Sequence, residues 1–265
     1  MSDDRTSTPD TDAASRPAGG RRFAALFWLL VVAIALPVAV PDGPIIRKTM
    51  AAVLFVVMLS GLNAIAYRRG ELIIGICLAL PAVVLNGLGL ALGNLTLYQI
   101  SHFGYLAFFA YLAILMLRWT LRQHEIEAET IYGAVSVYLL LALVWGLLYY
   151  SMALTHPGSF HFPVDDELGA IQAARVDQGS SSTLTVADGD LRRVSDSAQG
   201  TLMYYSFVTL TTLGYGDIYP VSDAARILAM LEATLGQLYL VILVARLVGL
   251  YTSQEQERRR KATPT

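Results

Sequence analysis

Seven consecutive residues have the types and spacing needed to bind a dehydrated cation through the backbone. They read Thr-Thr-Leu-Gly-Tyr-Gly-Asp at positions 211–217. Gly214 and Gly216 flank Tyr215, and glycine adopts backbone angles that other residues resist. Alternating such residues lets successive carbonyl oxygens point to one side of an extended strand. Because a ladder of carbonyls can replace the water shell of a cation, we predict an ion-coordinating loop here.

The composition indicates that the elements around this loop lie in a membrane. Of the 265 residues, 55% are hydrophobic and only 15% are charged, whereas soluble domains carry about 25% charged residues. An ordinary soluble enzyme is therefore not expected. The net charge of −2 gives no reason to expect nucleic acid as a partner.

Six apolar segments are long enough to cross a bilayer, which takes about 20 residues of helix. They cover residues 23–40, 49–67, 72–93, 100–119, 131–154 and 225–251. A seventh segment, residues 200–212, is too short to cross and fits a re-entrant helix. The predicted fold is an all-α integral membrane protein with six transmembrane helices and a re-entrant helix that leads into the loop.

The distribution of Lys and Arg near the span ends predicts the orientation. With six crossings, both termini lie on the same side. Twelve basic residues fall on that side and six on the other, three of them in a loop long enough to escape the rule. We expect a multi-pass protein of the cell membrane with both termini in the cytoplasm.

Residues 211–217 resemble the selectivity filter of the potassium channel superfamily. The preceding residues 204–210 resemble its pore helix, and residues 218–221 with Arg226 resemble the outer end of the pore-lining helix in prokaryotic members. The resemblance extends from position 131 onwards. It implies a six-span potassium channel with a single pore loop.

The resemblance also implies which groups bind K⁺. The coordinating residues would be Thr212, Leu213, Gly214, Tyr215 and Gly216, mainly through their carbonyls and with the Thr212 hydroxyl. No organic cofactor or resident metal is implied, only permeant K⁺ ions. Because each chain supplies one strand and the filter needs four, a fourfold symmetric homotetramer in membrane lipid is expected.

Further residues are assigned supporting roles by the same resemblance. Thr211 and Asp217 would support the filter, and Asp217 would lie at the outer mouth and bond to Tyr205 in the pore helix. Gly236 follows Gly216 by twenty positions, where the family has its inner-helix hinge glycine.

Two departures from the family pattern affect the filter. Leu213 replaces the commoner Val or Ile, so its side chain should pack differently behind the filter and alter conductance or inactivation. Val208 replaces a glutamate that pairs with the filter aspartate in some members. Filter stability must therefore rest on other contacts.

These features divide the chain into five parts. We expect a disordered cytoplasmic tail at 1–22, a four-span membrane domain at 23–119, a cytoplasmic linker at 120–130, a pore domain at 131–251 and a basic cytoplasmic tail at 252–265. The pore domain would comprise an outer helix at 131–154, an extracytoplasmic loop at 155–199, a pore helix at 200–212, a filter at 212–216 and an inner helix at 225–251.

Besides Arg226 at its start, the last apolar segment contains two charged residues, Glu232 and Arg246. Glu232 either faces the pore or bonds to a hydroxyl of the pore helix, from Tyr204, Ser206 or Thr209. We favour the structural bond, because Glu232 precedes Gly236 and should lie behind the filter wall. Arg246 is expected to snorkel to the cytoplasmic interface.

Strong voltage gating is not expected. The four-span domain has the span count of a voltage sensor, but Arg118 is the only arginine or lysine in its fourth span, residues 100–119. Steep voltage dependence needs several charges that move through the field. The gating stimulus is left open between leak, lipid, tension, protons and a partner protein.

Two alternative functions remain beside a potassium-selective channel. One is a weakly selective monovalent cation channel, and the other is a cation transporter subunit. An enzyme is not expected, because the sequence has no nucleophile–base pair, no HExxH motif and no paired intramembrane carboxylates.

Overall fold

The computed structural model describes residues 20–39, 44–65, 69–92, 94–123, 128–156, 158–163 and 188–262. These residues are mostly helical. Parts of the predicted organisation lie outside them, namely 1–19 of the tail, 40–43, 66–68 and 93 of the four-span domain, 124–127 of the linker, 157 and 164–187 of the extracytoplasmic loop, and 263–265 at the C-terminus.

Each predicted apolar segment lies almost wholly within one helix. The elements in chain order are α1 (Gly20–Ala39), α2 (Pro44–Ile65), α3 (Arg69–Leu92), α4 (Leu95–Arg122), α5 (Ala128–Thr155), β1 (Phe160–His161), α7 (Asp188–Leu210), β2 (Tyr219–Pro220) and α8 (Asp223–Ala262). Helix α7 begins earlier than the predicted pore helix, and α8 continues into the predicted basic tail.

Among the described residues, the four helices α3, α4, α5 and α8 are long and apolar enough to cross a membrane. Helices α1 and α2 contain the shorter apolar stretches Phe23–Ala35 and Ala52–Ile65. The chain is therefore a membrane protein. Four of the six predicted spans are thus helices long and apolar enough to cross a membrane, and all six crossings stay predictions.

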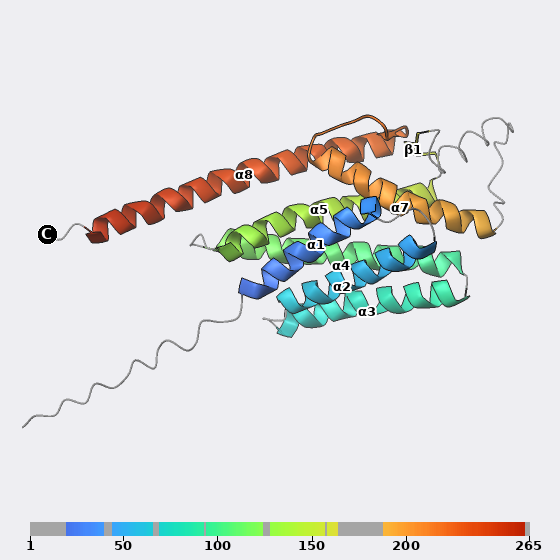
Figure 1. Ribbon diagram of the computed structural model, residues 1–265, viewed down its shortest axis with the longest axis horizontal. Coiled ribbons are helices and arrows are strands. Elements are labelled where there is room, and N and C mark those ends of the chain that lie inside the picture. Colours follow the sequence, from blue (N-terminus) through green and yellow to red (C-terminus); the bar gives the residue numbers. More distant parts are fainter. Residues whose placement is uncertain are drawn as a thin grey trace, which may run out of the picture.

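Helices α1 to α5 pack around one apolar core (Figure 1). Its most buried side chains include Leu26, Val57, Phe108, Leu112 and Leu140. Helix α4 ends at Arg122 and α5 begins at Ala128, so a short connection keeps α4 against the α5 of its own chain. The predicted four-span domain and the outer helix of the predicted pore domain thus share a core.

Helix α8 lies at the edge of this bundle, packed against α7 and α5, and its C-terminal part extends away from the other helices (Figure 1). Only 11% of its most apolar window is buried, against 50% for α4 and α5. Large apolar side chains are exposed along the helix, including Ile227, Met230, Leu235, Leu238, Val241, Val244 and Val248. A helix with so much uncovered apolar surface needs lipid or further protein around it.

A short strand pair joins the segment after the C-terminal end of α5 to the start of α8. Strands β1 and β2 are antiparallel, with Phe160 opposite Pro220 and His161 opposite Tyr219. The rings of His161 and Tyr219 stack at 4.6 Å. The Val221 amide donates to the Ser159 carbonyl at 2.8 Å, which fixes the chain just after the loop at 211–217.

One hydrogen bond joins the middle of α8 to the C-terminal end of α4. Arg246 donates to the carbonyl of Gln123 at 2.6 Å, and Gln123 is the C-cap of α4. The prediction that Arg246 simply snorkels to the interface therefore missed a specific partner. Carbonyls at a helix C-terminus attract cations because they are unpaired and carry the negative end of the helix dipole.

The packing of α3 against α4 can be tested at two glycines of α3. A Cβ at Gly89 would lie 2.8 Å from the backbone nitrogen of Tyr98, whereas a Cβ at Gly87 would meet nothing within 4 Å. Gly89→Ala should therefore lower the Tm in detergent. Gly87→Ala should leave it unchanged or raise it, since alanine favours a helix over glycine by about 0.5–1 kcal/mol. Equal shifts for both variants would contradict the close approach of the two helices.

Candidate functional site

Helix α7 ends in a left-handed turn at Thr212. The Thr212 amide donates to the Thr209 carbonyl at 3.0 Å, and the Leu213 amide donates to the Val208 carbonyl at 2.9 Å. This pair of bonds is the Schellman arrangement, in which the residue after the helix adopts positive φ. Thr212 has φ of 58°, a conformation that is strained for a β-branched residue and is usually left to glycine.

The backbone alternates in handedness through the loop that follows. Thr212, Gly214 and Gly216 have φ of 58°, 58° and 81°, whereas Leu213 and Tyr215 do not have positive φ. Such an alternation turns successive carbonyls towards the same side of the strand. The geometry therefore agrees with the alternation expected from the two glycines, and it adds Thr212 as the first left-handed residue.

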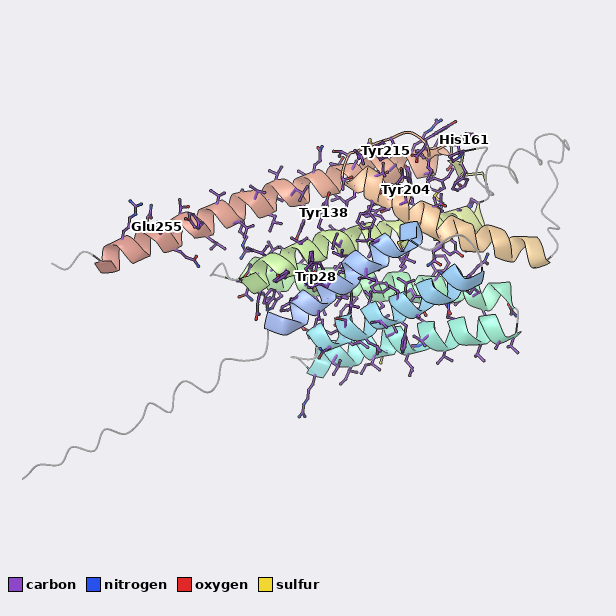
Figure 2. All side chains as sticks on the ribbon, viewed as in Figure 1. Trp28, Tyr138, His161, Tyr204, Tyr215 and Glu255 are labelled. Carbon is purple, nitrogen blue, oxygen red and sulfur yellow. The ribbon has the colours of Figure 1, made fainter. Side chains whose placement is uncertain are left out.

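The loop faces away from its own chain. All residues from 211 to 217 are exposed, and Tyr215 and Leu213 have 68% and 55% of their surface accessible. Figure 2 shows Tyr215 near Tyr204, at the end of the molecule that also carries His161. The carbonyl-bearing strand is therefore presented at the surface of the single chain, next to α7 and α8.

The backbone and a threonine hydroxyl attach the loop to α7. The Val208 carbonyl accepts from Leu213 and, at 3.3 Å, from the Gly214 amide. The Thr211 hydroxyl donates to the Phe207 carbonyl at 2.6 Å. Position 208 carries valine, whereas some members of the family that the sequence resembles carry a glutamate there. In this chain the main-chain carbonyl of Val208 holds the loop, in place of a side chain.

Asp217 receives its side-chain hydrogen bond from Tyr204, not from the predicted Tyr205. The Tyr204 hydroxyl donates to Oδ2 of Asp217 at 2.8 Å, and the Ile218 amide donates to Oδ1 at 3.0 Å. Tyr205 is buried and its ring contacts Tyr149 and Phe160. Neighbouring residues of a helix point about 100° apart, so the two tyrosine side chains have different surroundings.

The protonation of Tyr204 suits its role as a donor. Burial, followed by the hydrogen bond to Asp217, raises the pKa of Tyr204 to about 12. The phenol therefore keeps its proton at physiological pH and can donate to the Asp217 carboxylate throughout that range.

Glu232 lies behind α7 and bonds to one of the three hydroxyls considered for it. Ser206 of α7 forms a short hydrogen bond with Oε1 of Glu232, and Tyr149 of α5 donates to Oε2 at 2.6 Å. Glu232 has no exposed surface in the single chain. The side chain therefore connects three helices, as the structural interpretation predicted, and does not reach the surface that carries the loop.

The end of α7 also meets α5 and α8 directly. The Tyr138 hydroxyl of α5 donates to the Leu210 carbonyl at 3.1 Å. A Cβ added at Gly236 of α8 would lie 2.5 Å from that same carbonyl oxygen. Gly236 thus permits a close approach between α8 and the end of α7, whereas its role as a hinge stays a prediction.

Sequence reasoning missed Tyr138 and Tyr149. Both lie in α5, which is mostly apolar, and both bond to groups that support the loop. A buried tyrosine hydroxyl usually needs a partner, so tyrosines in an apolar span are a usable signal. The sequence alone does not say which partner each one finds.

Comparison with known families agrees with this location of the site. Residues 183–253 match a family model described as an ion channel. The matched range contains the loop, the apolar half of α7 and most of α8. No curated protein and no solved structure matches the chain. The match supports a place in the ion channel superfamily and passive ion conduction by this region.

The bond between Tyr204 of α7 and Asp217 of the loop can be removed by deleting one hydroxyl group. Tyr204→Phe should lower stability by about 1 kcal/mol per chain, since it removes one hydrogen bond to a carboxylate. Tyr251→Phe is the control, because Tyr251 is exposed near the other end of the molecule. Thermal unfolding in detergent measures both, and an unchanged Tm for Tyr204→Phe would contradict the assigned contact.

The close approach at Gly236 gives a second test. Gly236→Ala should push the end of α7 away from α8, at a cost of about 1–3 kcal/mol for overpacking, and should lower the Tm. Gly249→Ala lies in the same helix, where a Cβ meets nothing within 4 Å, and should not lower it. A hinge that needs only flexibility predicts no such difference between the two positions in the resting protein.

Proposed function

We propose that this chain forms a potassium-selective channel that conducts K⁺ passively through residues 212–216. The observation that carries the proposal is the alternation of left-handed and right-handed backbone from Thr212 to Gly216. Carbonyls brought to one side of the strand supply the oxygen ligands that a dehydrated K⁺ requires. In the proposed filter, Thr212, Leu213, Gly214, Tyr215 and Gly216 coordinate the ions.

The electrostatics of α7 favour the same function. The helix ends at Leu210, directly before the loop. A helix C-terminus carries the equivalent of about half a negative charge, which stabilises a cation in front of it. In the proposed channel, this end points towards the ion path and compensates part of the dehydration cost.

The proposed assembly is a fourfold symmetric homotetramer in lipid. One chain provides one strand of carbonyls, and a closed ring needs four. The uncovered apolar surface of α8 supports this assembly, since it is costly in water and would be covered by other subunits or lipid. A ring with cyclic symmetry uses the same pair of surfaces at every contact.

The rest of the proposal concerns topology and gating. We place six spans and both termini as the charge distribution predicts, with the termini in the cytoplasm. Strong voltage gating is not part of the proposal, because the described fourth helix carries arginines only at its cytoplasmic end, at Arg118 and Arg122. Each charge moved across the field is worth only about 2.3 kcal/mol per 100 mV.

The test is the reversal potential of the purified protein in a planar bilayer, with K⁺ on one side and Na⁺ on the other. A value near the potassium equilibrium potential is expected. A value near zero would instead favour a weakly selective cation channel. Restoration of selectivity by Leu213→Val would then assign the difference to the Leu213 side chain.

A backbone variant connects the current to the loop. Gly214→Ala places a side chain at φ of 58° where nothing lies within 4 Å, so its effect is conformational rather than steric. The left-handed region costs a non-glycine residue about 1–2 kcal/mol, and four subunits multiply that cost. The variant should lose selectivity, whereas Gly249→Ala should keep it. Full selectivity in Gly214→Ala would count against this loop as the filter.

A further inference from the structure

Three polar side chains from three helices meet behind the proposed filter. Tyr149 comes from α5, Ser206 from α7 and Glu232 from α8, and all three have no exposed surface in the single chain. Ion coordination by the loop does not require an acid at this place. The hydrogen-bond geometry of the cluster indicates what Glu232 does there.

Ser206 has two hydrogen-bond partners but only one hydrogen to give. Its hydroxyl oxygen lies 2.7 Å from the Ala142 carbonyl oxygen of α5 and closer still to Oε1 of Glu232. A hydroxyl donates one hydrogen, a carbonyl only accepts, and a carboxylate also only accepts. If Glu232 were ionised, one of these two short contacts would join two acceptors with no hydrogen of its own between them.

A protonated Glu232 satisfies every contact in the cluster. Its carboxyl hydrogen goes to Ser206, the Ser206 hydrogen goes to the Ala142 carbonyl, and the Tyr149 hydroxyl donates to the other oxygen of Glu232 at 2.6 Å. A single hydrogen shared between two acceptors would instead give weaker, poorly aligned bonds. The distances therefore favour one hydrogen for each contact.

The surroundings also favour the neutral acid. Within the part of the chain that the structure describes, the titratable groups found to interact electrostatically with Glu232 are Tyr138 and Tyr149 of α5 and Tyr205 of α7. The salt bridges that the described residues form at α8 join Asp223 to Arg226 and Glu255 to Arg259, and neither reaches Glu232. A buried carboxylate without a cation is penalised by several kcal/mol, whereas a hydrogen-bonded carboxylic acid is not.

We propose that Glu232 is held as a neutral carboxylic acid and that the chain of bonds from Glu232 through Ser206 to the Ala142 carbonyl positions the pore helix. Glu232 is a positioning residue, because it acts on the filter through α7 and touches no permeant ion. The effect on the filter rests on the function proposed above, whereas the protonation of Glu232 does not.

Loss of the proton has a defined consequence. When Glu232 releases its hydrogen to solvent base, the single Ser206 hydrogen must serve either Ala142 or Glu232. One of the two contacts then opens, and α7 shifts relative to α5 or α8. Conduction should therefore be lost reversibly as the pH rises past the point at which Glu232 ionises.

Infrared spectroscopy of the full-length protein in liposomes tests the protonation directly. The spectrum of the unsubstituted protein minus that of Glu232→Gln should contain a carboxylic-acid C=O band and no carboxylate bands. Glu255→Gln is the matched control, because Glu255 pairs with Arg259 at 3.0 Å near the end of the same helix. Its difference spectrum should contain carboxylate bands. Carboxylate bands from Glu232 at neutral pH would overturn the proposal.

The pH dependence of K⁺ current tests the positioning role. Glu232→Gln keeps an NH donor for Ser206 and an oxygen acceptor for Tyr149, so it should assemble, conduct at neutral pH and keep its current at alkaline pH. The unsubstituted channel should lose its current there. Failure of Glu232→Gln to assemble or conduct, or the same alkaline loss in both proteins, would overturn the proposal.

A third variant separates this inference from the channel function. Ser206→Ala removes the relay but leaves the acid, so it should impair conduction at neutral pH. If the unsubstituted protein were not selective for K⁺, the infrared result would still decide the protonation of Glu232. Unimpaired conduction by Ser206→Ala would contradict the relay.

Discussion

The strained backbone at Thr212 is the constraint on which the rest of the site depends. A β-branched residue with φ of 58° costs of order 1–3 kcal/mol unless its surroundings determine the conformation. The carbonyls of Val208 and Thr209 provide part of that determination through the Schellman bonds. They can do so only if the last turn of α7 is itself fixed, so the packing of α7 decides the shape of the loop.

Several unrelated contacts fix that last turn. Tyr138 and Gly236 meet the Leu210 carbonyl from α5 and α8, while the Ser206 cluster binds one face of α7 to both helices. On another side, Tyr205 inserts into an aromatic group with Tyr149 and Phe160. Hydrogen bonds thus set the position of α7 along its axis and its rotation about that axis, and ring packing sets its distance from α5. The strand pair of β1 and β2 holds the far end of the loop.

Much of the fold was predictable, because apolar length and glycine spacing are properties of the local sequence. The segments that became α3, α4, α5 and α8, the position of the loop and a hydroxyl partner for Glu232 all followed from such signals. Partner choice did not, since it depends on helix rotation. Tyr204 and Tyr205 are adjacent, and only packing decides which of them faces Asp217. The same limit applies to Arg246, whose partner Gln123 lies more than a hundred residues away.

The short connection between α4 and α5 has a consequence for how the protein is made. Only five residues lie between Arg122 at the end of α4 and Ala128 at the start of α5. The core of α1 to α5 therefore forms from neighbouring parts of one chain. Local contacts close at a low entropic cost. The core can therefore assemble during membrane insertion, before the chain meets another copy. In the proposed tetramer, folding of the bundle then precedes association, so a defect in the loop need not prevent the bundle from reaching the membrane intact.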